Sequence, residues 1–320
     1  MQRLLLLPVL LISFTAGCGG GGSAAAEAPP IRYAPGIAAS SANAVDFARV
    51  GMRSAFDLPC LAYIGASFLR RPVPEDPNAT PSTAPLTLSA EVQGPNGGAA
   101  VYSWDDENAD GVFSTGDVIT IDFDAYADGD LTLSGVMVIE DLRTAGAVTQ
   151  GGGTWIADAT LRLLGVELQL GAGVFTMTAD LPFRLENREV LEIFDLVVFE
   201  DLFVAGSEIK EGSSYRRYET DDDLSFQCFG YSYSPVLDAV VNWSTDSVVY
   251  LNTLTGYPVA GFVIVRGSEG TYVEVESQGG IGCTFPGFPL PCLFDVRGEY
   301  DGEEGVDETQ QVGAGDFLPQ

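Results

Sequence analysis

Oxygen-bearing residues are regularly spaced through one twelve-residue segment, 106–117. They are Asp106, Asn108, Asp110, Val112, Ser114 and Asp117. Alternate side chains at the first, third and fifth positions can converge on one hard cation, and Gly111 at the sixth permits the sharp turn that this requires. A backbone carbonyl at the seventh position adds another oxygen. The spacing therefore predicts a structural calcium site, in which Ca2+ would remove the repulsion among three carboxylates.

This segment is similar to the calcium loops of dockerin modules and EF-hands. It matches the template D-x-[DN]-x-[DN]-G-x5-E at positions 1, 3, 5 and 6, and Asp117 replaces the glutamate at position 12. The resemblance implies that Val112 would bind through its carbonyl, Ser114 through water, and that Phe113 would tuck under the loop. Because strands and not helices are expected around the segment, cohesin binding and sensor behaviour are not carried over. The short Asp117 side chain favours a Kd of about 10⁻⁴ to 10⁻³ M.

The alternative interpretation of this segment is a solvated hairpin loop. Asp, Asn and Gly are common in turns for conformational reasons, and the chain contains 45 acidic residues, so that chance matches arise more easily. Three other acidic segments lack the template spacing and are interpreted as solvated turns. These segments are 124–129, 219–223 and 301–304.

The first eighteen residues carry the features of an export signal. Arg3 precedes an apolar run at 4–14, which is too short for a helix that spans a bilayer and suits a secretory signal. The run ends in Thr15-Ala16-Gly17-Cys18 and resembles the lipobox of bacterial lipoproteins. The resemblance implies cleavage before Cys18 and attachment of lipid to its thiol. An ordinary cleaved signal with an incidental cysteine is the alternative.

A lipidated Cys18 would tether a water-soluble body to a membrane. Gly19, at the second mature position, is not the Asp that retains enteric lipoproteins at the inner membrane. By analogy with that sorting rule, the expected location is the outer membrane of the cell envelope. The choice between its periplasmic and surface faces stays open.

Four cysteines remain after Cys18, and export would place them in an oxidising compartment. They are Cys60, Cys228, Cys283 and Cys292. An even number of exported cysteines predicts two disulfides. Cys283 and Cys292 bracket a Pro-rich stretch and are expected to pair, which leaves Cys60 with Cys228. A zinc site is the alternative, although no spacing is Cys-x-x-Cys.

The elements that must position these residues are mainly strands. Apolar residues alternate from Leu86 onward, in roughly a dozen segments separated by short turns. Two of these strands, 99–104 and 118–126, flank the acidic segment, and a change of phase at Leu164-Gly165 predicts a bulge. The segment 190–204 is denser in apolar residues and is interpreted as a strand buried on both faces, or as a helix.

The predicted fold is all-β. A sheet of this size must curve or close to protect its edges, so we expect a large, strongly curved antiparallel sheet or a partly closed barrel, with a β-sandwich as the alternative. One short N-terminal helix is expected at about 41–56, after a serine cap. The predicted organisation is a signal at 1–17, a lipidated cysteine and flexible tether at 18–40, a helix and Pro-rich connection at 41–85, and a β domain at 86–320.

Composition excludes several classes of function. A net charge of −30 would repel a phosphate backbone and opposes nucleic-acid binding. The chain has no histidine, which excludes Ser-His-Asp and Cys-His nucleophiles and imidazole metal sites. We assign no catalytic residue from the sequence and favour a non-enzymatic function over an enzymatic one.

The favoured hypothesis is a calcium-stabilised lipoprotein with a binding or scaffolding role, whose partner would be a glycan, a lipid or an envelope protein. Phe229, Tyr231 and Tyr233 alternate along one predicted strand and could form a face on which sugars stack, although such a pattern is more typical of a core. The alternatives are a lipid or lipoprotein carrier with an apolar cavity, and a carboxylate-dependent glycoside hydrolase, for which the sequence singles out no pair of acids.

Overall fold

The structure is a computed structural model that describes a large part of the chain. It describes residues 35–70, 86–108, 110–128, 131–146, 148, 153–170, 173–188, 191–199, 202–204, 207–209, 211–220, 223–245, 248–251, 258–278, 293–303 and 305–313. The predicted export signal, Cys18, Cys283 and Cys292 lie outside these residues, as does the side chain of Cys60.

Within the described residues, eighteen strands form one sheet. They are β1 (Leu86–Gln93), β2 (Gly97–Asp106), β3 (Val118–Asp128), β4 (Leu131–Ala145), β5 (Thr154–Leu170), β6 (Gly173–Arg188), β7 (Leu191–Phe199), β8 (Leu202–Val204), β9 (Ser207–Ile209), β10 (Glu211–Glu219), β11 (Leu224–Ser234), β12 (Ala239–Ser244), β13 (Val249–Leu251), β14 (Pro258–Ala260), β15 (Phe262–Arg266), β16 (Tyr272–Ser277), β17 (Leu293–Glu299) and β18 (Glu308–Gly313).

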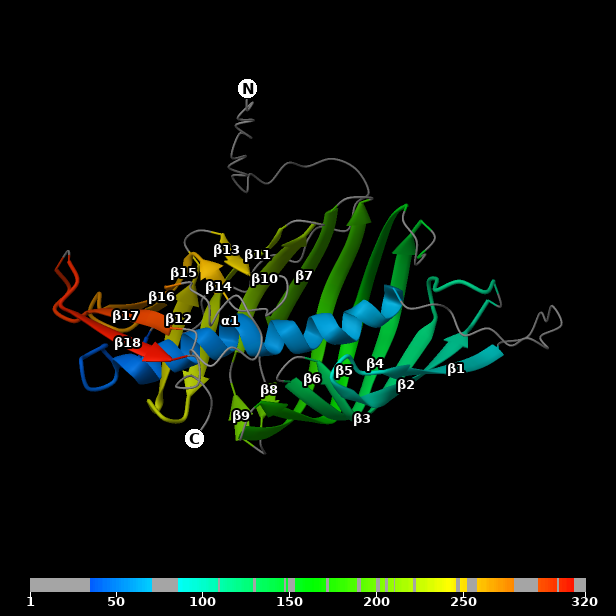
Figure 1. Ribbon diagram of the computed structural model, residues 1–320, viewed down its shortest axis with the longest axis horizontal. Helices are drawn as coiled ribbons and strands as arrows, with labels where there is room; N and C mark the ends of the chain where they lie inside the picture. Colours follow the sequence, from blue (N-terminus) through cyan, green and yellow to red (C-terminus); the bar gives the residue numbers. More distant parts are fainter. Residues whose placement is uncertain are drawn as a thin grey trace, which may run out of the picture.

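The strand pairing is antiparallel throughout. Strands β1 to β7 pair in chain order, and β7 then pairs with β10. The order continues through β11, β12, β15, β16, β17 and β18. The short strands β8 and β9 extend from β6, and β13 and β14 extend from β11. This confirms the all-β class and the large curved antiparallel sheet, which does not close into a barrel (Figure 1).

One long helix occupies the concave side of the sheet and crosses its strands (Figure 1). Helix α1 (Ala44–Ser67) leads into a single 3-10 turn, η1 (Phe68–Arg70). The expected helix at 41–56 is therefore placed correctly but is too short, and Asn43 precedes it in place of the predicted serine cap. Pro59 stands inside α1, where proline removes one backbone hydrogen bond. Leu61 and Ala66, which follow Pro59, have no exposed surface, and this burial in the core stabilises the second half of the helix.

The core lies between α1 and the sheet. Phe47 and Leu61 of α1 and Phe68 of η1 have no exposed surface. The Phe68 ring lies 5.8 Å from Tyr102 and 5.7 Å from Phe123, measured between ring centroids. Because aromatic edge-to-face contacts add to the burial of apolar area, η1 anchors the end of the helix on β2 and β3.

Two sequence interpretations of strands have different outcomes. The predicted bulge is confirmed, because the register of β5 with β6 shifts between Leu163 and Val166 and Gly165 has a φ of +66°, a conformation that favours glycine. The interpretation of 190–204 as one strand buried on both faces is wrong. The region forms β7 and β8, and the described side chains at 191–196 alternate between buried and half-buried, because only one face meets the core.

The predicted tether is also shorter than expected. Backbone N–H groups of Gly36 and Ser268 form hydrogen bonds with Val240 and Ile37 carbonyls, at 3.0 and 2.7 Å respectively. The Ala39 N–H donates to Thr271 Oγ1 at 2.8 Å. Residues 36–39 are therefore bonded to the sheet and belong to the folded body.

Candidate metal sites

The predicted calcium segment connects β2 to β3, and the sheet register brings its two ends together. Asp105 is opposite Val118, so Asp106 and Asp117 are neighbours just beyond the end of this ladder. Their side chains are 2% and 0% exposed. Two carboxylates that are this deeply buried must be compensated by hydrogen bonds or by a cation.

The first half of the loop folds as the template requires. Asp106 Oδ2 accepts the Gly111 N–H at 2.9 Å, and Asp106 Oδ1 accepts the Asp110 N–H at 3.3 Å. Asn108 Oδ1 and Asp110 Oδ1 each accept a backbone N–H two residues further on, both at 2.9 Å. Gly111 has a φ of +76°. The three side chains therefore turn inward over the loop's own backbone instead of pointing away in unrelated directions.

Asp117 connects the second half of the loop to the core. Its Oδ2 accepts Trp104 Nε1–H and the Ser114 N–H, both at 2.9 Å, and its Oδ1 accepts the Glu107 N–H at 3.1 Å. Phe113 is 1% exposed, and its ring centroid lies 5.2 Å from that of Trp104. The expectation that Phe113 tucks under the loop is confirmed.

The Asp117 carboxyl is costly to ionise where it lies. Burial raises the pKa of the Asp117 carboxyl, and the negative charge of Asp106 acts in the same direction. The hydrogen bonds from Ser114, Trp104 and Glu107 lower this pKa. A divalent cation would stabilise the ionised form and thereby offset the cost of burying it.

The predicted ligands of the β2–β3 loop are nevertheless not gathered around one point. The carboxylate oxygens of Asp106, Asp110 and Asp117 do not all lie within 4.8 Å of one another, and Asn108 Nδ2 donates to Ser114 Oγ at 2.8 Å. A cation at this loop would therefore require these side chains to move toward one another while the backbone turn is retained.

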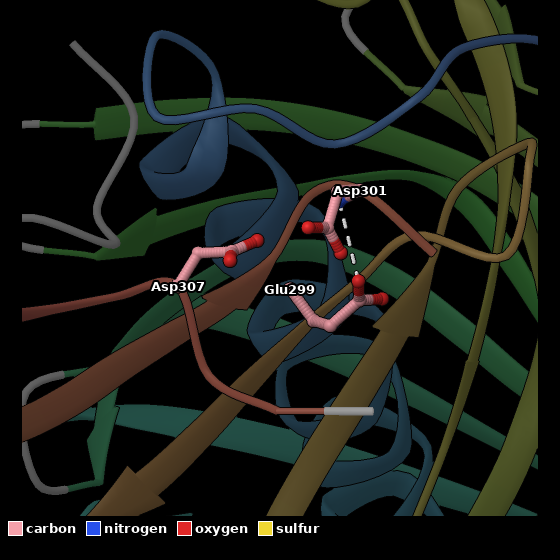
Figure 2. Close-up of side chains that lie close together, drawn as sticks. All are labelled: Glu299, Asp301 and Asp307. Carbon is pink, nitrogen blue, oxygen red and sulfur yellow. Dashed lines mark hydrogen bonds between the residues drawn. The ribbon is translucent and has the colours of Figure 1, made fainter. Parts of the chain in front are cut away.

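A second acidic group, at the β17–β18 connection, was missed by sequence reasoning. One carboxylate oxygen from each of Glu299, Asp301 and Asp307 lies within 4.8 Å of the others (Figure 2). Glu299 is 2% exposed, and its Oε1 accepts the N–H groups of Asp301 and Gly302 at 3.2 and 2.6 Å. This group could hold a divalent cation.

The hairpin register explains why that group was missed. Gly298 is opposite Glu308, so Glu299 and Asp307 face each other across the loop, although eight positions separate them in the sequence. Asp301 is exposed, as expected for the turn at 301–304, but it is directed toward Glu299 and Asp307 (Figure 2). The template for a contiguous calcium loop does not contain this spacing, and the sequence held no other signal for it.

Two further interpretations need correction. Tyr231 is 1% exposed, whereas Phe229 is 44% exposed, and Tyr233 is half-buried with its hydroxyl 2.7 Å from Asp238 Oδ1. The three rings therefore do not form an exposed face for sugars. Glu219, interpreted as part of a solvated turn, is half-buried and accepts a hydrogen bond from Tyr63.

The cysteine pairings stay predictions. Cys228 is buried in β11 with 2% of its surface exposed. Its predicted partner, Cys60, has no described side chain, and Cys283 and Cys292 lie outside the described residues.

Two observations bear on the carrier and membrane hypotheses. Helix α1 covers the concave face of the sheet (Figure 1), and a cavity lined by Met52, Val249 and Phe262 beneath it has a volume of about 10 Å³, room for one water molecule. Among the described helices, none has both the length and the apolar character needed to cross a membrane.

Comparisons of the chain with protein-family models, with curated proteins and with solved structures found no match. The function must therefore be argued from the residues themselves.

Proposed function

We propose that the protein is an envelope-anchored lipoprotein whose folded body binds a structural calcium ion at the β2–β3 loop and serves in binding or scaffolding. The supporting observation is the direction of the Asp106, Asn108 and Asp110 side chains, which accept N–H groups of residues 110–112. These bonds form a compact backbone turn with the alternate oxygen-bearing side chains folded over it, which supports a calcium ligand set in which those side chains converge on the ion.

The proposed ligands are the side chains of Asp106, Asn108, Asp110 and Asp117, the Val112 carbonyl, and Ser114 through water. Calcium takes six to eight oxygen ligands and tolerates irregular geometry. This suits a site that combines two buried and several exposed oxygen ligands. The ion would compensate the buried charges of Asp106 and Asp117 and hold β2 and β3 in register.

The anchor is proposed from the lipobox at Cys18. A lipid on this thiol and a tether as far as residue 35 would leave the sheet in water at the outer membrane. The disulfides Cys283–Cys292 and Cys60–Cys228 belong to the same proposal, because export exposes them to an oxidising compartment. A glycan, lipid or envelope-protein partner is proposed ahead of carried cargo, since α1 occupies the concave face where cargo would bind.

Calcium is expected to raise the melting temperature of the protein. At 10 mM Ca2+, a Kd of about 10⁻⁴ to 10⁻³ M gives about 1.4 to 2.7 kcal/mol of stabilisation, which corresponds to an increase of several degrees in Tm for a domain of this size. Calorimetry in 10 mM Ca2+ and in chelator measures the difference. Asp110→Asn should remove most of it.

Asp301→Asn is the matched control, because it removes an acidic group at the β17–β18 connection and leaves the β2–β3 loop intact. It should retain the response to calcium. An unchanged melt of the unsubstituted protein would refute the calcium proposal. If Asp301→Asn lost the response and Asp110→Asn kept it, the calcium site would be assigned instead to Glu299, Asp301 and Asp307.

The calcium response should depend on pH. Since the pKa of Asp117 is raised in the folded protein, its ionisation without calcium lowers the free energy of unfolding as pH rises from the ordinary Asp pKa through the raised value. Calcium offsets this loss only when Asp117 is ionised. The increase in Tm should therefore be full above the raised pKa and disappear below it.

A further inference from the structure

A cluster of charged groups surrounds Tyr63 near the carboxyl end of α1. It comprises Tyr63 of α1, Arg70 of η1, Glu192 of β7, and Arg217 and Glu219 of β10; this set is called the Tyr63 cluster. Glu192 and Glu219 are cross-strand partners in the β7–β10 ladder. Tyr63 and Glu192 are 9% and 6% exposed, so the centre of the cluster is removed from water.

The Tyr63 hydroxyl is the central atom of this cluster. It lies 2.6 Å from Glu192 Oε1, 2.7 Å from Glu219 Oε2 and 2.9 Å from Arg70 Nη2. Arg70 Nη1 also lies 2.7 Å from Glu192 Oε2. Arg217 stacks on the phenol ring, with its Cζ 3.6 Å from the centroid, and donates from Nη2 to Glu219 Oε2 at 2.8 Å.

The contacts of the Tyr63 hydroxyl need one more hydrogen than a phenol and two ionised carboxylates can supply. A phenol carries a single hydroxyl hydrogen, and Arg70 can only donate, so Tyr63 can donate to one of the two carboxylates. The other carboxylate oxygen would then face the phenol oxygen at hydrogen-bond distance with no hydrogen between them. Both short contacts are satisfied only when one glutamate carries a proton and donates it to the Tyr63 oxygen.

Burial identifies Glu192 as the residue that holds this proton. Its side chain is 6% exposed, against 35% for Glu219, and removal from water disfavours the charged form. Burial raises the pKa of Glu192 and outweighs the positive charge of Arg70, which acts to lower it. Burial also acts to raise the pKa of Glu219, but the charge of Arg217 and the hydrogen bonds from Tyr63 and Arg217 leave it below its ordinary value. The negative charge of the whole chain also favours a retained proton.

We propose that Glu192 is protonated in the folded protein, that it donates to Tyr63 while Tyr63 donates to Glu219, and that loss of this proton releases the carboxyl end of α1 from β7 and β10. After deprotonation, two negatively charged carboxylates compete for the single hydrogen of the phenol. One of the two Tyr63 contacts, with Glu192 or with Glu219, must then lengthen, because it would join two oxygens without a hydrogen.

The consequence is a pH-dependent contact between the helix and the sheet, independent of calcium. Tyr63 lies four residues before the end of α1, and Arg70 follows in η1, and the polar contacts of both residues with β7 run through Glu192. The Tyr63 ring also packs on Phe194 of β7, with 5.4 Å between the ring centroids. A carboxyl whose pKa is raised on folding stabilises the folded state less as pH rises through that value. The end of α1 should therefore be held firmly at low pH and open more readily at high pH.

Two measurements on the full chain test this proposal. Infrared spectroscopy should detect the carbonyl band of a buried protonated carboxylic acid at a pH above the ordinary Glu pKa, and Glu192→Gln should lack it. Amide hydrogen exchange, corrected for the intrinsic effect of pH, should show protection of residues 61–70 falling as that band disappears. In Glu192→Gln, whose amide still donates to Tyr63, this protection should not change with pH.

Two further variants provide the controls. Glu186→Gln, on the neighbouring strand β6, removes a carboxyl outside the Tyr63 cluster and should keep both the band and the pH dependence. Tyr63→Phe should lower protection of residues 61–70 at every pH. The proposal is overturned if the unsubstituted protein has no such band, or if protection of residues 61–70 does not depend on pH. Those two results require no variant to fold.

Discussion

Replacing Asp117 with alanine is expected to reduce the free energy of unfolding by about 3 kcal/mol even without calcium. The Asp117 carboxylate accepts hydrogen bonds from Trp104 Nε1, the Ser114 N–H and the Glu107 N–H. A buried donor left without its acceptor costs about 1 to 3 kcal/mol, and Trp104 has no exposed surface through which water could replace the lost oxygen. Urea denaturation in the presence of chelator measures the loss.

Two matched variants separate this structural effect from calcium binding. Asp117→Asn keeps one oxygen acceptor, so it should cost less than Asp117→Ala while still removing the response to calcium. Asp122→Ala removes an exposed carboxylate from β3 and should change stability by no more than about 0.5 kcal/mol. A loss below about 1 kcal/mol in Asp117→Ala would show that the three hydrogen bonds do not hold the loop.

Replacing Cys18 with serine is expected to move the protein from the membrane fraction to the soluble fraction. Serine offers no thiol for lipid attachment, and each methylene of a buried acyl chain contributes about 0.8 kcal/mol to membrane binding, so its loss removes the proposed anchor entirely. Fractionation of the envelope of a bacterial host that expresses the protein, together with labelling by a fatty-acid analogue, measures both consequences. The unsubstituted protein should be labelled and Cys18→Ser should not.

Cys283→Ser controls for the loss of a thiol elsewhere in the chain. This variant should remain labelled and membrane-bound, because the Cys283 thiol is proposed to form a disulfide and not to carry lipid. If Cys18→Ser stays in the membrane fraction, or the unsubstituted protein takes up no label, the lipid-anchor proposal is refuted.

Local patterns predicted the sheet because they depend on near neighbours. Alternation of apolar residues located β2 and β3 around the acidic segment, and the phase change at Gly165 located the bulge in β5. The predicted helix was too short because it ended before Pro59. The residues of α1 beyond Pro59 pack against the sheet, and the second half of the helix depends on that packing. That contact with distant strands leaves no local signal.

The same distinction applies to the candidate metal sites and to the Tyr63 cluster. The β2–β3 loop was predictable because its donors are contiguous and its turn is encoded by Gly111. The group at Glu299 and Asp307 depends on hairpin register, and the Tyr63 cluster on a helix meeting two strands far along the chain. Tyr231 shows the limit of periodicity, since alternation along β11 assigns residues to a face but does not reveal which part of that face is covered.

The most direct test of the proposed calcium site is terbium luminescence. Tb3+ replaces Ca2+ at oxygen-rich sites and emits when a nearby indole transfers energy to it, and Trp104 Nε1 lies 2.9 Å from Asp117 Oδ2. Excitation of tryptophan should produce emission that excess Ca2+ removes. The emission should be lost in Trp104→Phe and Asp110→Asn and retained in Trp155→Phe and Asp301→Asn. Absence of emission, or its loss in Asp301→Asn with retention in Asp110→Asn, would contradict a calcium ion at the β2–β3 loop.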